Sequence, residues 1–268
     1  MKQYEGGYKV RYTAGFLSII LCTVLWTVSV DAAQGYEVVD VKNGATLKGS
    51  VNFSGALPAD EKNIITKDVK YCGEGHEVGK YVVDDSRVKN AVVWLEGVAK
   101  GKVLPKKSVP ITIKKCIAEP HVGIGFVGGE YLFKNEDEIL HTIQLKLGLA
   151  YQKKVSERLV KDGATIYNIA LPLKDLEIEK PIKNYHRYSE ETGYIQIRSN
   201  VHNWINGYIF IFDHPYAAVT DEKGAFVMDN IPPDEYLLKV WHEGFGMQER
   251  KIKVSPGGLV EANIAFDQ

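Results

Sequence analysis

The sequence predicts an all-β protein, because apolar and polar residues alternate along most of its periodic segments. A strand shows this period of two because successive side chains point to opposite faces of a sheet. Turn-forming residues separate the segments, as in residues 221–224 and 255–258. Helical periodicity is confined to residues 59–69 and 151–159. We therefore expect strands at residues 47–53, 91–95, 194–198 and 237–241.

The N-terminal segment predicts export. Lys9 and Arg11 precede an apolar run over residues 14–30, and Ala32 ends a sequence suited to cleavage. We expect a signal peptide over residues 1–32 and a periplasmic or extracellular protein. The alternative is an uncleaved anchor, although the 17 residues of the run fall short of the ~20 that span a bilayer. No other membrane contact is expected.

Composition and motifs exclude several classes of function. The chain has 33 basic and 34 acidic residues and no basic run interleaved with aromatics, so we expect no nucleic-acid binding. It contains neither a Gly-x-Ser-x-Gly elbow nor a His-Glu-x-x-His motif, and no phosphate or dinucleotide loop. We expect a protein that is not an enzyme.

Two cysteines follow the predicted signal peptide, Cys72 and Cys116. In an exported protein such a pair favours a disulfide, which would close a loop of 44 residues and stabilise the fold by about 4 kcal/mol in the chain-entropy model. The alternative is that Cys116 is a copper thiolate. The spacing from Cys116 to His121 is not that of a usual copper loop.

Residues 199–205 resemble a blue-copper loop in which two ligands are replaced. Type 1 copper takes two imidazoles, a thiolate and a weak axial thioether, and the loop usually reads Cys-x-x-His-x-x-Met. Here the frame reads Ser199, His202 and Ile205, and an upstream imidazole is present as His141. If a metal binds, we expect Cu(II) or Zn(II) at His141 and His202, with His121 as a third ligand. The alternative is that these histidines only form hydrogen bonds.

The order of the predicted strands carries a wider resemblance. Residues 109–213 resemble a cupredoxin, a Greek-key β-sandwich. The segments before and after them look like a carboxypeptidase-regulatory-like (transthyretin-like) β-sandwich, carried by residues 49–55, 88–97, 218–226 and 231–240. Two further segments, His214-Pro215-Tyr216 and Trp241-His242-Glu243, add to this pattern. With them, the chain is similar to exported bacterial proteins labelled methylamine-utilisation or plastocyanin-like. The resemblance implies a discontinuous sandwich, residues 40–106 plus 215–268, and a cupredoxin-like sandwich at 107–214.

Three further side chains have expected positions. Trp204 follows His202 in the loop, so we expect it near the surface, where cupredoxins dock their partners. His214 and His242 are expected to form buried hydrogen bonds between the two sandwiches, with Glu243 orienting the His242 ring.

The leading functional prediction is an exported binding or scaffold protein. Its degenerate cupredoxin-like module would lack the type 1 ligands at Ser199 and Ile205 and would dock to a periplasmic redox protein or an envelope component. One alternative is a histidine-ligated copper or zinc protein, with electron transfer as a possible activity. The other is carbohydrate or cell-envelope binding through the regulatory-like sandwich.

Overall fold

The computed structural model describes residues 35–148, 165–183 and 194–267. The predicted signal peptide and the expected helix at 151–159 lie outside these residues. Within the described part of the chain, no helix combines the length and apolarity needed to cross a membrane. The described elements are strands apart from one four-residue helix, so the all-β prediction is confirmed.

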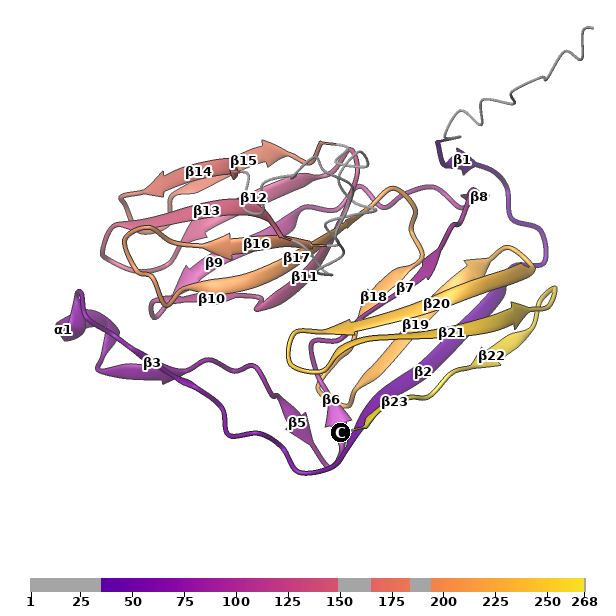
Figure 1. Cartoon of the computed structure of the whole chain (residues 1–268). Coiled ribbons are helices and arrows are strands. Elements are labelled where there is room, and N and C mark those ends of the chain that lie inside the picture. The colour runs from indigo at the N-terminus through magenta and orange to yellow at the C-terminus, as the bar shows by residue number, and fades with distance from the viewer. Residues whose placement is uncertain (1–34, 149–164, 184–193, 268) are drawn as a thin grey trace, which may run out of the picture. The chain divides into compact units, whose positions relative to one another are not determined.

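Two sheets enclose one hydrophobic core (Figure 1). The first sheet has the antiparallel order β18 (Ala217–Val219), β7 (Val92–Glu96), β20 (Asp234–His242), β21 (Gly246–Val254). The second contains β19 (Ala225–Ile231), β2 (Ala45–Ser54), β6 (Arg87–Val88), β5 (Val83–Asp84), β22 (Leu259–Glu261) and β23 (Ile264–Asp267).

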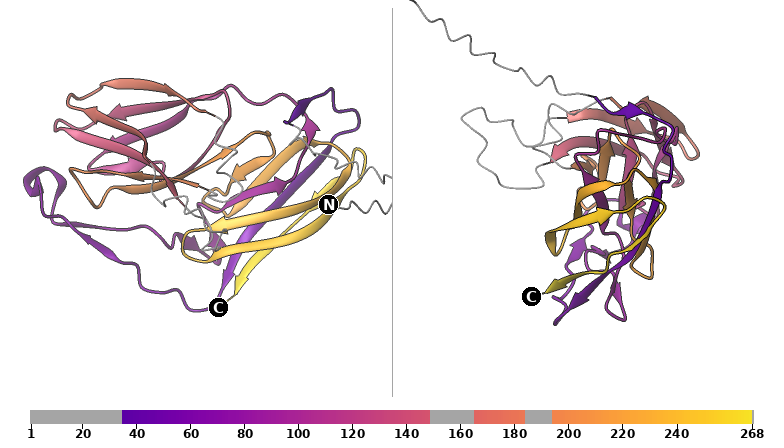
Figure 2. Two further views of the ribbon diagram at one scale, coloured as in Figure 1. Left: turned by 45° about the horizontal axis from the view of Figure 1, so that its top comes forward. Right: turned by 90° about the vertical axis from the view of Figure 1, so that its right-hand side faces the viewer.

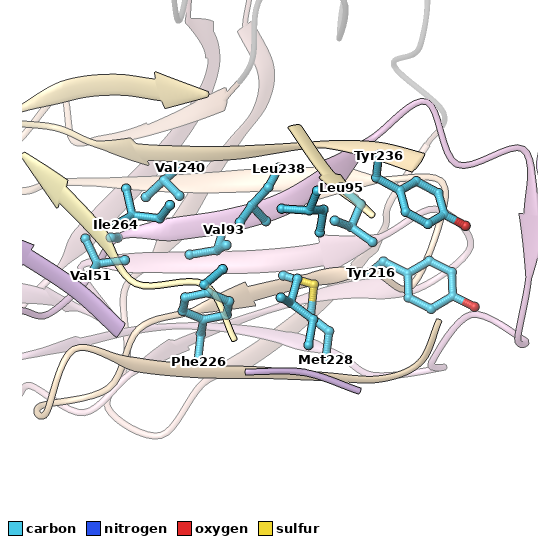
Figure 3. Packing of buried hydrophobic residues seen from close by; sticks show 14 of the residues in the cluster. Val51, Val93, Leu95, Tyr216, Phe226, Met228, Tyr236, Leu238, Val240 and Ile264 are labelled. Carbon is cyan, nitrogen blue, oxygen red and sulfur yellow. The ribbon is translucent and has the colours of Figure 1, made fainter. Parts of the chain in front are cut away.

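The core between these sheets follows from the alternation along β2 and β20. Leu47, Val51 and Phe53 of β2 are buried, and Leu238 and Val240 face them from β20. Figure 3 shows Val51, Val240 and Leu238 in this core with Phe226 and Met228 of β19. Apolar burial of this kind stabilises a fold by roughly 25 cal/mol per Å² of buried surface.

A second pair of sheets encloses a separate core. One sheet has the order β10 (Ile117–Glu119), β9 (Val109–Lys114), β12 (Glu130–Asn135), β15 (Glu177–Pro181). The other has the order β11 (Val122–Phe126), β17 (Asn206–Phe212), β16 (Tyr194–Arg198), β13 (His141–Gly148), β14 (Thr165–Leu171).

An aromatic cluster connects the two pairs of sheets. Val92 and Trp94 of β7 contribute to it, while Val93 and Leu95, the alternate residues, enter the first core. The remaining buried members are Val122, Phe126, Phe210, Phe212 and Trp241. The β7 strand is therefore apolar on both faces because both faces are covered. Residues 35–268 form one compact unit, and the division at 107 and 214 stays a prediction.

A long loop, residues 55–82, leaves the end of β2 and returns to β5 (Figures 1 and 2). It contains β3 (Lys62–Ile64), which pairs with β4 (Gly75–Glu77), and the helix α1 (Val69–Cys72) between them. The expected helix at 59–69 is wrong, since residues 62–64 form a strand and the helix begins only at Val69. A further short pair joins β1 (Glu37–Val38) to β8 (Lys100–Gly101).

Candidate metal site

Two buried imidazoles face each other at one end of the second pair of sheets. His141 is the first residue of β13, and His202 lies in the connection from β16 to β17. Both side chains are fully buried. Their Nδ1 atoms are 2.9 Å apart, and the ring centroids are 4.7 Å apart. The structure thus brings together the two histidines that the sequence singled out.

The outer nitrogen of each ring faces a carboxylate. His141 Nε2 lies 2.9 Å from Asp137 Oδ2, and His202 Nε2 lies 2.8 Å from Asp68 Oδ2. Carboxylates only accept hydrogen bonds, so both Nε2 atoms carry a hydrogen in these contacts. The tautomers follow from these partners. In the neutral rings, the two Nδ1 atoms therefore present lone pairs to each other.

Two facing lone pairs repel each other unless a cation lies between them. A proton shared by the two Nδ1 atoms would turn one ring into a charged imidazolium. A metal ion would instead bind both rings in their neutral form. Burial, followed by the neighbouring His202, lowers the pKa of His141, and the two carboxylates oppose this shift. The buried environment thus disfavours a charged His141 ring, while the carboxylates supply negative charge that a bound cation would balance.

Asp137 is held by its own turn. The buried side chain of Asn135 donates to the carbonyls of Ile139 and Leu171, at 2.9 and 3.0 Å, and its oxygen accepts from Asp137 N. The Asp137 carboxylate then accepts from the backbone N–H groups of Lys115 and Cys116, at 2.7 and 2.8 Å. These bonds fix the carboxylate beside His141, as the second shell of a metal-binding histidine requires.

Ser199 organises the loop that carries His202. Its Oγ accepts from the backbone N–H groups of His202 and Val201, at 3.1 and 3.2 Å, and lies 3.0 Å from Thr142 Oγ1. The Ile205 N–H donates to the His202 carbonyl at 3.0 Å, and the Ile205 side chain enters the second core. The two positions that hold a thiolate and a thioether in a usual blue-copper loop therefore hold, in this chain, a loop-stabilising hydroxyl and a core side chain.

The 55–82 loop covers the histidine pair. Besides Asp68, it supplies Tyr71, whose hydroxyl accepts from Glu138 N at 3.1 Å. The predicted disulfide is confirmed, because Cys72 of α1 is bonded to Cys116, which follows β9. Asp68 has a positive φ of 52° at the start of α1, a conformation that Asp tolerates better than most residues.

A second donor set shares His141. Cys116, Asp137 and His141 are all buried, and their potential ligand atoms lie within 4.8 Å of one another. In this structure Cys116 is committed to its disulfide. Sequence reasoning missed both Asp137 and Asp68. The Asn135-Glu136-Asp137 turn beside His141 was a signal for Asp137, whereas nothing near Asp68 in the sequence points to His202.

His121, the third expected ligand, has a different partner. Its Nε2 pairs with the buried carboxylate of Glu243, and its ring meets Tyr208 edge-on with centroids 5.8 Å apart. The structure does not join it to the His141–His202 pair. The expected contact between Glu243 and His242 is also replaced, since Glu243 binds His121 and His242 Nδ1 accepts from Gly244 N at 3.1 Å.

The expectation that Trp204 is exposed is wrong. Its side chain is buried, with 6% of the residue accessible, because the 55–82 loop covers the connection on which Trp204 lies. Its Nε1–H donates to the carbonyl of Cys116 at 3.1 Å, and the centroids of its ring and of the His202 ring are 5.0 Å apart. Trp204 thus packs behind the histidine pair. His214 is buried as expected, but its Nδ1 accepts from Tyr216 N at 3.2 Å, and the corresponding bond of His242 comes from Gly244 N, so neither of these bonds joins the two sandwiches.

Comparisons with known proteins return only distant likenesses. No protein-family model and no curated protein matches the sequence. Among solved structures, the chain is similar to amicyanin from Paracoccus versutus, with 14% identity over 41% of this chain and 85% of that chain, and a TM-score of 0.28. A purple cupredoxin from Nitrosopumilus maritimus gives 16% identity over 39% of this chain and 99% of that chain, with a TM-score of 0.27.

A copper-containing nitrite reductase from Thermus scotoductus SA-01 is also similar, with 14% identity and a TM-score of 0.27. The match covers 42% of this chain and only 24% of the reductase. These neighbours are copper proteins by their names, and at this level of similarity they assign no family to the chain.

Proposed function

We propose that this protein binds a divalent transition-metal ion, Cu(II) or Zn(II), through Nδ1 of His141 and Nδ1 of His202. The observation that supports the proposal is the pair of Nδ1 atoms facing each other at 2.9 Å, with a carboxylate behind each ring. Metal-binding histidines commonly donate their second nitrogen to a carboxylate in this way.

The separation of the two nitrogens suits a shared ion. Imidazole ligands bind Zn(II) at about 2.0–2.1 Å, so two of them in tetrahedral geometry lie about 3.3 Å apart. Only a small separation of the two rings is needed to reach this value from the observed 2.9 Å. Two imidazoles suit Cu(II) or Zn(II), and the positions expected for softer ligands hold Ser199 and Ile205.

The bound metal would be exchangeable rather than a tuned redox centre. A blue-copper centre needs a thiolate and a weak axial ligand, and neither Ser199 nor Ile205 offers one. The alternative of docking through Trp204 has lost its support, because Trp204 is buried. Export to the periplasm, docking to a redox or envelope partner by another surface, glycan binding and the absence of enzymatic activity stay predictions.

Metal titration of the purified full chain tests the proposal. We expect stoichiometric uptake of Zn(II) or Cu(II), with nitrogen hyperfine coupling in the electron paramagnetic resonance spectrum of the copper form. His141→Ala and His202→Ala should each lose this uptake, and His121→Gln should keep it because His121 lies elsewhere. Circular dichroism would show that the variants are folded. Uptake that survives in folded His202→Ala would contradict the proposal.

A further inference from the structure

We infer that the Cys72–Cys116 disulfide controls a second, thiolate-containing metal site formed by Cys116, Asp137 and His141. The inference rests on the proposed function in one respect, since His141 serves both sites. In the oxidised protein the metal would have only the two imidazoles. In the reduced protein Cys116 Sγ, a carboxylate oxygen of Asp137 and the His141 ring would bind a metal at the second site, so that the affinity for a soft or borderline metal depends on the state of the disulfide.

The three donor groups are already gathered. Their potential ligand atoms lie within 4.8 Å of one another, and all three residues are buried. A zinc ion bound to sulfur, nitrogen and oxygen at about 2.0–2.3 Å holds such atoms about 3.3–3.8 Å apart. The His141 Nε2 and Asp137 Oδ2 atoms, now 2.9 Å apart, would separate slightly, and the sulfur would approach them by up to about 1 Å, which is within the reach of side-chain rotation.

Cys116 is fixed by contacts that do not depend on the disulfide. Its N–H donates to Asp137 Oδ2 at 2.8 Å, and its carbonyl accepts from Trp204 Nε1 at 3.1 Å. Cys116 follows β9 and precedes β10, which are paired with each other. When the sulfur–sulfur bond is broken, its thiol remains beside Asp137 and His141.

Cys72 lies in a much less protected element. It is the one buried residue of α1, and its neighbours Val69 and Tyr71 are each 42% exposed. The helix belongs to the 55–82 loop, which is attached over the site by Asp68, Tyr71 and the disulfide itself. Local opening of such a surface segment costs less than opening a core strand, so a reductant reaches the bond from the Cys72 side.

The exchange balances with a dithiol as the reductant. A thiolate of the dithiol attacks Cys72 Sγ, the bond to Cys116 breaks, and Cys116 leaves as a thiolate. The second thiol of the reductant then displaces Cys72, which leaves as a thiolate and takes up a proton, while the dithiol becomes a disulfide. Two electrons have passed to the protein. The divalent metal then binds the Cys116 thiolate in place of a proton, and the hydrogen that His141 Nε2 donates to Asp137 is released to solvent as the ring nitrogen and the carboxylate bind the metal.

Co(II) is a suitable probe because its bond to a thiolate gives a charge-transfer absorption that imidazole does not give. The full chain would be used in a Cys22→Ser background, so that Cys72 and Cys116 are the remaining cysteines. Oxidised protein, protein reduced with a phosphine, Cys72→Ser and Cys116→Ser would be titrated with Co(II). The two variants lose the same disulfide, and only Cys72→Ser keeps the proposed ligand.

We expect the thiolate band in the reduced protein and in Cys72→Ser, with a dissociation constant lower than that of oxidised protein by about tenfold or more, because a charged sulfur ligand has been added. Cys116→Ser should show no band. Circular dichroism would confirm that both variants fold, and the reduced wild-type protein provides the same test without substitution.

Equal spectra and affinities for Cys72→Ser and Cys116→Ser would overturn the inference. The proposed function is tested separately, by metal binding to the oxidised protein and by the loss of this binding in His202→Ala. Binding by the oxidised protein without a band after reduction would reject the thiolate site alone. A band after reduction without binding by the oxidised protein would reject the two-imidazole site and support the thiolate site.

Discussion

Asp68 and His202 are 134 residues apart in the chain, and their side chains meet at 2.8 Å. The contact orients the His202 ring, because the carboxylate accepts from Nε2 and leaves Nδ1 free to face His141. It also gives the 55–82 loop a direct connection to the proposed metal site. The metal affinity of the protein should therefore depend on a residue far from the histidines in sequence.

We predict that Asp68→Asn weakens metal binding by about 10- to 100-fold, the usual effect of losing a carboxylate behind a histidine ligand. The stability of the apoprotein should change little, because the Asp68 side chain is 39% exposed and Asn also tolerates a positive φ. Isothermal titration with Zn(II) measures the affinity, and urea unfolding measures the stability. Asp84→Asn is the control, because Asp84 is the exposed residue of β5. An unchanged affinity would show that Asp68 does not orient the ligand.

We predict that Ser199→Ala destabilises the fold by about 1–3 kcal/mol, because the backbone N–H groups of Val201 and His202 lose a buried acceptor. Metal affinity should fall as well, since His202 lies in the loop that this hydroxyl orders. Urea unfolding measures the free energy. Ser54→Ala removes an exposed hydroxyl that donates to Asp267, and it should change the stability by no more than about 0.5 kcal/mol. Equal effects of the two substitutions would contradict the role of Ser199.

We predict a strong coupling between His121 and Glu243. The two side chains are 17% and 6% exposed, so removing one leaves the other buried without its partner. A double-mutant cycle with alanine should give a coupling free energy of about 1–3 kcal/mol. The exposed pair Lys89–Glu222 provides the comparison and should give less than about 1 kcal/mol. Similar couplings in the two cycles would argue against a structural role for the buried pair.

We predict that His242 makes the protein less stable in acid. Burial, together with the nearby His121 and Lys80, lowers the pKa of His242 to about 4. The unfolded chain binds the proton near pH 6.5, so the stability from the neutral buried ring is complete above that pH. It is lost as the pH falls from about 6.5 to about 4, by up to about 3 kcal/mol.

Urea unfolding between pH 7.5 and pH 4, in wild type and in His242→Asn, measures this dependence. The asparagine oxygen can still accept from Gly244 N, and it does not titrate. The variant should be less stable at neutral pH, because the stacking of His242 on Phe245 is lost. Its stability should fall less steeply with acid than that of the wild type. Parallel pH curves would show that His242 is not the group responsible.

Strands that bury only one face could be predicted from the sequence, because their apolar and polar residues alternate. Leu47, Val51 and Phe53 alternate with polar residues in β2, since one face of its sheet covers a core. The helix expected at 59–69 failed because α1 contains only four residues and is anchored by Cys72, which is bonded to Cys116 in the turn between β9 and β10. The local periodicity of a sequence gives no information about a tertiary contact of that kind.

Part of the candidate metal site could also be predicted from local sequence. His141 and His202 were found from a loop spacing, which is local. Asp68 was missed because the path of the 55–82 loop over the site depends on contacts formed only in the folded chain. Trp204 was placed at the surface because loops usually lie there, and the same covering loop explains why it is buried.

The pairing of β2 also sets the order in which the chain can fold during synthesis. Apart from a single residue pair with β6, its partners are β19, β22 and β23, which begin at Ala225, Leu259 and Ile264, after every described strand of the second core has been made. At about 5–20 residues per second, the ribosome needs roughly 10–30 s to go from the end of β2 to the start of β19. During that interval β2 presents an apolar face and open backbone groups. The first core is therefore completed only after the last strands, β22 and β23, have been made.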